Sequence, residues 1–425
     1  MEVNNLKISN KIIEILLIIF PVVLLFSNII SELIILILIV FYLSISKVNK
    51  VLESLKDPII LLLLLFWLYI ILNYIINFQN NPDLERTIFF IRFPLLILSI
   101  SFFINTLKLN LKKIFLFWLI FLLIVCADLF IQKFTLTNII GYKAIPQGDI
   151  YRLGGFMDQE LKISNFIFHF GSITLAFFIS SNLFNNTKHT LANLLFLLLL
   201  IVTIFITAER SNFVTIISFA CLLIIFFSFK NIKLSLSFLG ILLILFVITF
   251  EKNKDNLSLR MTSQIIQNFK LLKHEPGKSY FNKNSHYFTH ASVAYQIFEQ
   301  NKLFGVGIKN FRNFCDNDNF NKDIHPSWQK SKCSTHPHNF YFEILSELGM
   351  LGLLLLIIFF LFSFINVFKV YLKTKNNFIL INLFIILVYF IPFLPRGSFF
   401  TNWNAIIFWT IFGFMYATYK KPQKK

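Results

Sequence analysis

Long apolar runs constrain the fold of this chain more than any other feature. The chain has 425 residues, of which 56% are hydrophobic and only 14% are charged. A helix needs about 20 mostly apolar residues to cross the hydrocarbon core of a bilayer. Stretches such as PIILLLLLFWLYIILNYIINF (58–78) reach that length. The pattern predicts an all-α, polytopic membrane helical bundle.

The apolar runs predict about twelve spans and one large loop. The spans are 12–28, 30–46, 58–78, 87–105, 114–132, 164–183, 190–207, 212–229, 234–250, 340–368, 378–394 and 402–419. The first run continues into the second without a small-residue cleavage site, so we expect no cleavable signal peptide. We expect a single membrane domain, with nine spans in 1–250, a large, mostly helical loop in 251–338, and three spans with a basic tail in 339–425.

The basic residues indicate orientation and argue against nucleic acid as a partner. The net charge is +18, but Lys and Arg stand in short clusters between apolar runs and do not cover one soluble face. An N-terminus in the cytoplasm leaves Lys clusters in every second connection and in the tail KKPQKK, as the positive-inside rule requires. Segment 133–163, the turn AERSN, the loop 251–338 and PRGS then face the opposite side, which is the periplasm of a Gram-negative cell. We expect the functional residues to act on that side of the membrane.

The loop shows helical patterns and carries two cysteines. NLSLRMTSQIIQNFKLL and SHYFTHASVAYQIFEQ have helix-like periodicity, and FGVGIKNF breaks the pattern with two glycines. Cys315 and Cys333 lie in this loop, where an oxidising compartment would allow a disulfide. The spacing alone leaves bridged and free thiols both open. Cys126 and Cys221 lie inside spans, where we expect packing roles.

The segment STHPHNFYFEILSELGMLGLL places ionisable residues at the mouth of the tenth span. His338 lies at its outer end, with Asn339 placed to cap the helix. A neutral imidazole can accept a proton from a sugar hydroxyl, although an interfacial histidine bound to water is the other interpretation. Glu343 and Glu347 are one turn apart, and carboxylates inside hydrocarbon are costly. They could orient His338, line a wet cavity, or pair with a basic residue on a neighbouring span, and we favour the ion pair.

Arginines on the same face suit a diphosphate ligand. Arg210 lies in the turn TAERSN and Arg260 just beyond the ninth span. Guanidinium groups bind phosphate oxygens through two parallel hydrogen bonds, while snorkelling to the interface is the alternative role. Further polar residues on this face that could support a pocket are Arg92, Arg152, Asp158, Glu160, Arg312 and Arg396.

A metal site is not expected. The histidines that could contribute to one are His286, His290, His325, His336 and His338. Two of them have one-turn spacing, but no carboxylate or cysteine completes a recognisable set of ligands.

The residues around His338 resemble a known family, the bacterial O-antigen ligases and polymerases, which are polytopic membrane glycosyltransferases. The ligase signature has a histidine, then Asn, Ser or Gln, nine residues, and two glycines three apart. HNFYFEILSELGMLG matches it at His338, Asn339, Gly349 and Gly352. Leu353 and Leu354 stand where the signature usually closes with two threonines. RLGGFMDQEL, AERSNF and NKLFGVGIKNF are similar to other family stretches, in the same order, over roughly residues 140–415.

The resemblance implies a reaction at the periplasmic face of the bacterial inner membrane. A glycan moves from undecaprenyl diphosphate to an acceptor hydroxyl, without nucleotide sugar, metal or other cofactor. By motif position, Arg210 and, as a weaker match, Arg260 hold the diphosphate, and His338 activates the acceptor. Our leading hypothesis is a ligase that uses lipid A core as acceptor, and the alternative within the family is a polymerase. A transporter of lipid-linked sugars would bind its substrate near the midplane with broken helices, whereas the polar residues here gather at one face.

Overall fold

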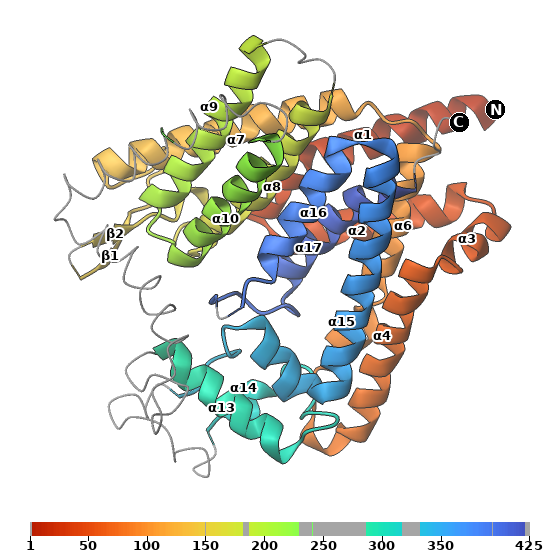
Figure 1. Ribbon diagram of the computed structural model, residues 1–425, viewed down its shortest axis with the longest axis vertical. Coiled ribbons are helices and arrows are strands. Elements are labelled where there is room, and N and C mark those ends of the chain that lie inside the picture. The colour runs from red at the N-terminus through yellow and green to blue at the C-terminus, as the bar shows by residue number, and fades with distance from the viewer. Residues whose placement is uncertain are drawn as a thin grey trace.

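The computed structural model describes residues 2–148, 150–181, 187–228, 240, 286–316, 332–392 and 394–420, and this part of the chain is mostly helical (Figure 1). Seven helical segments in it are long and apolar enough to cross a membrane. They are α1 (Glu2–Phe26), α2 (Asn28–Ile45), α4 (Pro58–Ile76), α5 with α6 (Leu84–Phe89 and Arg92–Asn105), α7 (Leu111–Thr135), α8 (Ile163–Ser180) and α15 (Phe340–Thr374).

Further helices cover four more of the predicted spans. They are α9 (Thr187–Ile206), α10 (Arg210–Ser228), α16 (Asn377–Tyr389) and α17 (Asn402–Tyr419). Short helical pieces are α3 (Val48–Leu55), η1 (Phe78–Asn80) and η2 (Gly155–Met157). Apart from Gly240, the predicted span 234–250 falls outside the described residues, so the count of twelve spans stays a prediction.

The structure divides the predicted span 87–105 into α5 and α6. Pro94 has no N–H and cannot donate to the carbonyl four residues earlier, which interrupts the helical ladder. The N–H of Phe93 instead donates to the carbonyl of Phe90 at 3.0 Å, a tighter turn. The break therefore follows from one residue in an otherwise apolar run.

A short hairpin departs from the all-α expectation. Strands β1 (Ile145–Gln147) and β2 (Ile150–Arg152) pair antiparallel, with Ile145 opposite Arg152. Gly148 lies in the turn with φ of 61°, a conformation that glycine adopts without steric cost. The predicted all-α class holds for most of the described chain, and this hairpin is the departure from it, because this segment between two spans has no apolar helical face to bury.

Aromatic packing holds the bundle together inside, and its outer side chains are apolar. Helices α6 and α17 pack along each other, and the Trp409 ring stacks on Phe93 with centroids 6.0 Å apart. Large apolar side chains exposed on the outer surfaces include Ile29, Leu65, Ile120 and Leu361. Exposed residues of this kind on several long helices indicate faces in contact with lipid. The chain is a multi-pass membrane protein.

Helix α15 is broken at Gly349, where φ is 69°. The break frees backbone groups, and loop residues bind them. The N–H of Gly307 donates to the carbonyl of Glu347 at 2.8 Å, and the N–H of Met350 donates to the carbonyl of Lys302 at 2.8 Å. The backbone of a loop segment therefore lies against the break, at Gly349.

The chain ends and the loop helices lie at opposite ends of the molecule. Figure 1 shows the N- and C-termini together, far from α13 (His286–Gln300) and α14 (Phe311–Phe314). Helix α13 confirms the helix predicted from SHYFTHASVAYQIFEQ. The helix predicted from NLSLRMTSQIIQNFKLL lies outside the described residues.

Candidate active site

His338 stands immediately before α15 in a left-handed backbone conformation. Its φ is 53°, and its side chain is half-buried. Asn339 caps the helix, since its Oδ1 accepts the N–H groups of Tyr341 at 3.0 Å and Phe342 at 3.3 Å, which confirms the predicted cap. The carbonyl of His338 accepts the N–H of Arg396 at 2.8 Å. A left-handed conformation is uncommon for a residue other than glycine, so these bonds fix the direction in which the imidazole leaves the chain.

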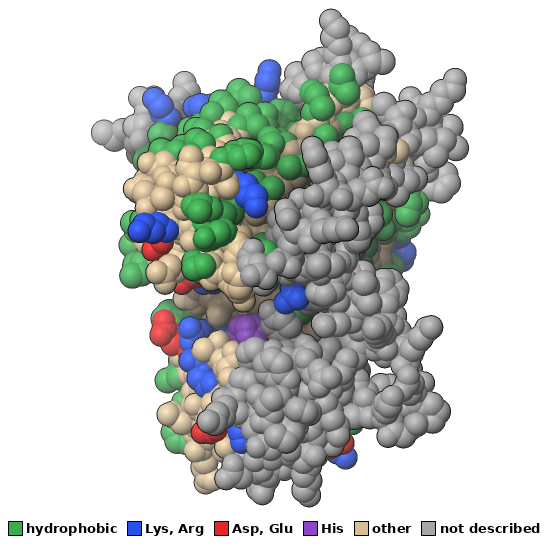
Figure 2. Space-filling view, turned by 90° about the vertical axis from the view of Figure 1, so that its left-hand side faces the viewer, with side chains coloured by type: hydrophobic (Ala, Val, Ile, Leu, Met, Phe, Trp, Pro, Cys, Tyr) green, Lys and Arg blue, Asp and Glu red, His purple; other side chains and the backbone are tan. Residues whose placement is uncertain are grey.

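Two further histidines surround His338. The ring centroids of His336 and His290 lie 4.1 Å and 5.4 Å from that of His338. Ser334 Oγ lies 3.1 Å from His338 Nε2, within hydrogen-bonding distance. In Figure 2 a histidine side chain is visible in a hollow between the upper and lower parts of the molecule, with Lys and Arg side chains nearby. No group of three or more potential metal ligands occurs among the residues that the structure describes.

His336 is neutral at physiological pH. Its Nε2 donates to the carbonyl of Arg396 at 3.2 Å, and Thr335 Oγ1 lies 3.1 Å from its Nδ1. Burial, with the positive charge of Lys309, lowers the pKa of His336 to about 4. A neutral ring beside His338 adds no positive charge that would oppose proton uptake there.

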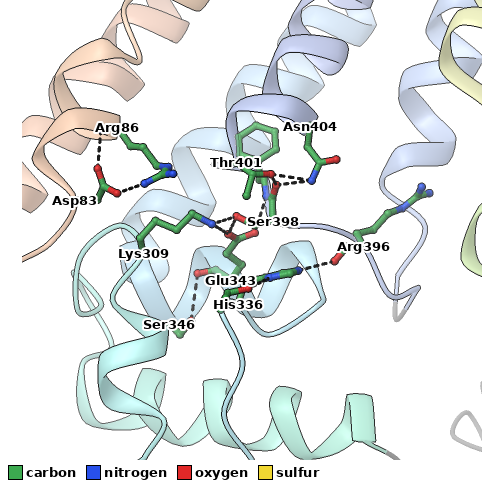
Figure 3. A network of polar contacts seen from close by, with 12 residues as sticks. Asp83, Arg86, Lys309, His336, Glu343, Ser346, Arg396, Ser398, Thr401 and Asn404 are labelled. Atoms are coloured by element: carbon green, nitrogen blue, oxygen red, sulfur yellow. Dashed lines mark hydrogen bonds and ion pairs between the residues drawn. The ribbon is translucent and has the colours of Figure 1, made fainter. Parts of the chain in front are cut away.

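Glu343 is the centre of a buried polar cluster (Figure 3). Its carboxylate accepts the N–H of Phe399 at 2.8 Å and the hydroxyl of Ser398. Lys309 Nζ lies 3.7 Å from Glu343 Oε1 and also donates to Ser398 Oγ. We expected a basic partner on a neighbouring span. The partner comes instead from the loop, after its glycine-rich run.

Glu347 lies one turn further along α15 and is fully buried. Neither of its carboxylate oxygens has a hydrogen-bond partner among the described residues. Lys309 is the cation paired with Glu343 on the preceding turn of this helix. Burying an uncompensated charge is costly, which makes Lys309 important to this end of the helix.

Arg396 supports the histidines through its backbone. Its side chain is buried, with Nη2 donating to the carbonyl of Val388 at 2.7 Å and the guanidinium carbon 5.1 Å from the centroid of the Tyr389 ring. Burial lowers the pKa of Arg396 to about 10, so the group is still protonated at neutral pH. The residue joins His336 and His338 to the connection between α16 and α17.

Arg210 is the first residue of α10 and is half-buried. The structure gives it no hydrogen bond or ion pair with any described residue. Its neighbour Glu209 instead pairs with Arg152 of β2. Among the described residues, the guanidinium of Arg210 has no ion pair, while that of Arg152 is paired with Glu209. Arg260 lies outside the described residues.

Side-chain hydrogen bonds connect the Arg210 helix to the Glu343 cluster. Asn212 Nδ2 donates to Ser164 Oγ at 2.8 Å. The next residue of α8, Asn165, donates from Nδ2 to Asn404 Oδ1 at 3.3 Å, and Asn404 Nδ2 donates to the carbonyl of Ser398 at 3.0 Å. The start of α10, the start of α8, and the connection before α17 are therefore at the same end of the bundle.

Cys315 and Cys333 are joined by a disulfide, with their Cα atoms 5.2 Å apart. That separation is within the ordinary range for disulfides. Cys315 is buried against Val293 and Ile297 of α13. The bond ties the segment that leads into His338 to the described helices of the loop.

Residues 195–357 match the family model described as O-antigen ligase. This part of the chain is similar to the O-antigen ligase family. A comparison with curated proteins finds no match. The matched residues contain both Arg210 and His338, whereas Arg152 and Arg396 lie outside them.

Sequence reasoning missed Lys309, Ser398 and Glu209. A signal for Lys309 was present, since two carboxylates in an apolar helix require a nearby cation. The lysine in FGVGIKNF follows two glycines that allow close approach of the backbone. Nothing in the sequence distinguishes Ser398 or Glu209 from other polar residues in connecting segments.

Proposed function

We propose that this protein transfers a glycan from undecaprenyl diphosphate to an acceptor hydroxyl, with lipid A core as the acceptor. The observation that carries the proposal is the match of residues 195–357 to the O-antigen ligase family model. The matched residues include Arg210, a half-buried arginine with no ion pair among the described residues, and His338, a half-buried histidine ahead of α15. Arg210 and His338 supply the two functions that such a transfer needs. They bind an anionic leaving group and activate an alcohol.

In the proposed reaction, His338 takes the proton of the acceptor hydroxyl as the oxygen attacks the anomeric carbon of the donor. The bond from that carbon to the diphosphate oxygen breaks, and the electron pair leaves with the diphosphate. Arg210, with Arg260 as a further expected ligand, neutralises this charge through paired hydrogen bonds. The His336 ring next to His338 is neutral. Unlike a cationic neighbour, it does not oppose proton uptake by His338.

We place the reaction at the periplasmic face of the bacterial inner membrane. The Lys-rich connections support a cytoplasmic N-terminus and tail. The termini lie at the opposite end of the molecule from α13 and α14, which supports the same orientation (Figure 1). A polymerase that extends a lipid-linked glycan is the second candidate, because Leu353 and Leu354 replace the threonines of the ligase signature.

The direct test is transfer by purified protein carrying His338→Ala, given lipid-linked glycan and lipid A core. Loss of one general base typically lowers the rate about 10²- to 10⁴-fold, while donor binding and thermal unfolding should stay as in the wild type. Wild-type rates from the variant would remove His338 from the mechanism. Absence of transfer by the wild-type protein to either lipid A core or a second lipid-linked glycan would refute the function itself.

A further inference from the structure

Three segments that are distant in sequence meet at the carboxylate of Glu343. The first is α15 itself, the second is the loop segment that carries Lys309, and the third is the connection that carries Ser398 and Phe399. Figure 3 shows Lys309, Glu343 and Ser398 pointing toward one another. We call these three side chains the Lys309 cluster.

The cluster is joined to His338 by two short paths. Along α15, Glu343 follows His338 by five residues, and the capped first turn lies between them. Along the other path, Ser398 follows Arg396 by two residues, and Arg396 binds the carbonyl of His338 at 2.8 Å through its N–H. A shift of the loop or of the connection relative to α15 would therefore move the imidazole of His338.

The burial of the charges argues against a role in stability alone. The Lys309 and Glu343 side chains are only 4% and 1% exposed. Apolar residues of the same volume often replace a buried ion pair without loss of stability, so such a pair is weak evidence for a stabilising role. Its hydrogen bonds and ion pair, however, join three segments that are distant in sequence.

We propose that the Lys309 cluster positions His338. It holds the loop and the α16–α17 connection against α15, and so fixes the place of the His338 imidazole relative to the acceptor. The catalytic meaning of this inference rests on the proposed function. Lys309, Glu343 and Ser398 do not touch substrate in this account. They act through His338.

The test uses full-length protein in lipid nanodiscs, with Lys309→Met, Lys309→Arg and the double variant K309M/E343Q. The double variant removes both charges, so no buried carboxylate is left at position 343 without its cation. It is the test variant if Lys309→Met does not fold. Lys302→Met is the matched control, because Lys302 is an exposed lysine on the same loop segment. Three quantities are measured. Glycan transfer gives kcat and the donor KM, and mass spectrometry gives the rate at which diethyl pyrocarbonate modifies His338.

A displacement of about 1 Å in a catalytic group can cost on the order of 100-fold in rate, so we expect a 10- to 100-fold fall in kcat with donor KM unchanged. The fall should occur in Lys309→Met or, if that variant does not fold, in K309M/E343Q. His338 modification should change several-fold in the same variant. Lys309→Arg should restore kcat and the rate of His338 modification, and Lys302→Met should match the wild type. Wild-type kcat and His338 modification in the double variant would overturn the inference, as would a loss confined to donor KM. If the wild-type protein transfers no glycan, the proposed function fails, whereas His338 modification still decides whether the cluster positions the histidine.

Discussion

Gly349 lies directly against the backbone of Leu303. A Cβ added at Gly349 would lie 2.3 Å from the carbonyl oxygen of Leu303, far inside van der Waals contact. On the facing segment, a Cβ added at Gly305 would lie 2.5 Å from the carbonyl carbon of Glu347. The broken helix and the loop therefore fit backbone to backbone at two glycines, and the Lys309 cluster lies next to this contact.

Gly349→Ala should destabilise the protein for two reasons. The left-handed conformation alone costs on the order of 1–3 kcal/mol for a residue with a side chain, and the clash with Leu303 adds to that. Gly148→Ala is the matched control, because Gly148 has φ of 61° but nothing within 4 Å of an added Cβ. Thermal unfolding in detergent should show a larger loss for Gly349→Ala. Equal losses would mean that the contact with Leu303 does not matter.

The apolar runs predicted most spans correctly because bilayer thickness sets the length of a spanning helix. They did not predict the break in α15, since a glycine in an apolar helix has more than one use. Gly352 does allow close packing, as its added Cβ would lie 3.1 Å from Cε1 of Tyr69 on α4. Gly349, three residues earlier, instead takes a left-handed conformation. Only the tertiary contact with the loop separates the two cases.

In the candidate active site, the sequence identified ionisable residues at positions where such residues are uncommon. His338 at a helix start, and Glu343 inside an apolar run, stand out by local pattern. Lys309 does not, because it is one of 39 Lys and Arg residues and lies in a loop where an exposed lysine is ordinary. Lys309 is buried because the loop packs against α15, a contact between segments distant in sequence that a local pattern cannot predict.

His336 should make the protein sensitive to acid. Its pKa is about 4 in the folded chain, against 6.5 ordinarily, because of burial and the nearby charges of Lys309, His290 and Arg312. As pH falls, His336 takes up a proton in the unfolded state before it does so in the folded state. The contribution of neutral His336 to folding stability is therefore complete above about pH 6.5 and is lost toward pH 4. The difference corresponds to roughly 3 kcal/mol. Unfolding measured at pH 8 and pH 4.5 should show a smaller acid loss in His336→Gln than in the wild type, and equal losses would contradict this account.

Arg210→Lys should impair donor binding nearly as much as Arg210→Ala. Lysine keeps the charge but lacks the planar fork that forms two parallel hydrogen bonds with a diphosphate. A hydrogen bond to a charged group contributes about 1.5–3 kcal/mol, which predicts a 10- to 100-fold loss of donor affinity. Lys143→Ala is the control, since it removes an exposed positive charge near the hairpin. Near-normal donor affinity in Arg210→Lys would favour interfacial snorkelling of this side chain.

The orientation can be tested with cysteines placed at Lys302 and Lys50, both of which are exposed. In a background without Cys126 and Cys221, a membrane-impermeant maleimide should label Lys302→Cys in intact spheroplasts. Lys50→Cys should be labelled only after the inner membrane is permeabilised, because Lys50 lies in a predicted cytoplasmic connection. The opposite pattern would place the candidate active site in the cytoplasm and overturn the proposed reaction.

The acceptor distinguishes a ligase from a polymerase, because both reactions need the same diphosphate binding and the same general base. A ligase must admit lipid A core, a glycolipid anchored in the same leaflet, whereas a polymerase must admit a second undecaprenyl-linked glycan. We predict that deletion of the gene leaves full-length polymer on the lipid carrier and lipid A core without polymer. Complementation with the wild type should restore polymer on lipid A core, and complementation with His338→Ala should not. If the deletion strain instead carries single repeat units on lipid A core, attachment is intact and polymerisation has failed, so the protein is the polymerase.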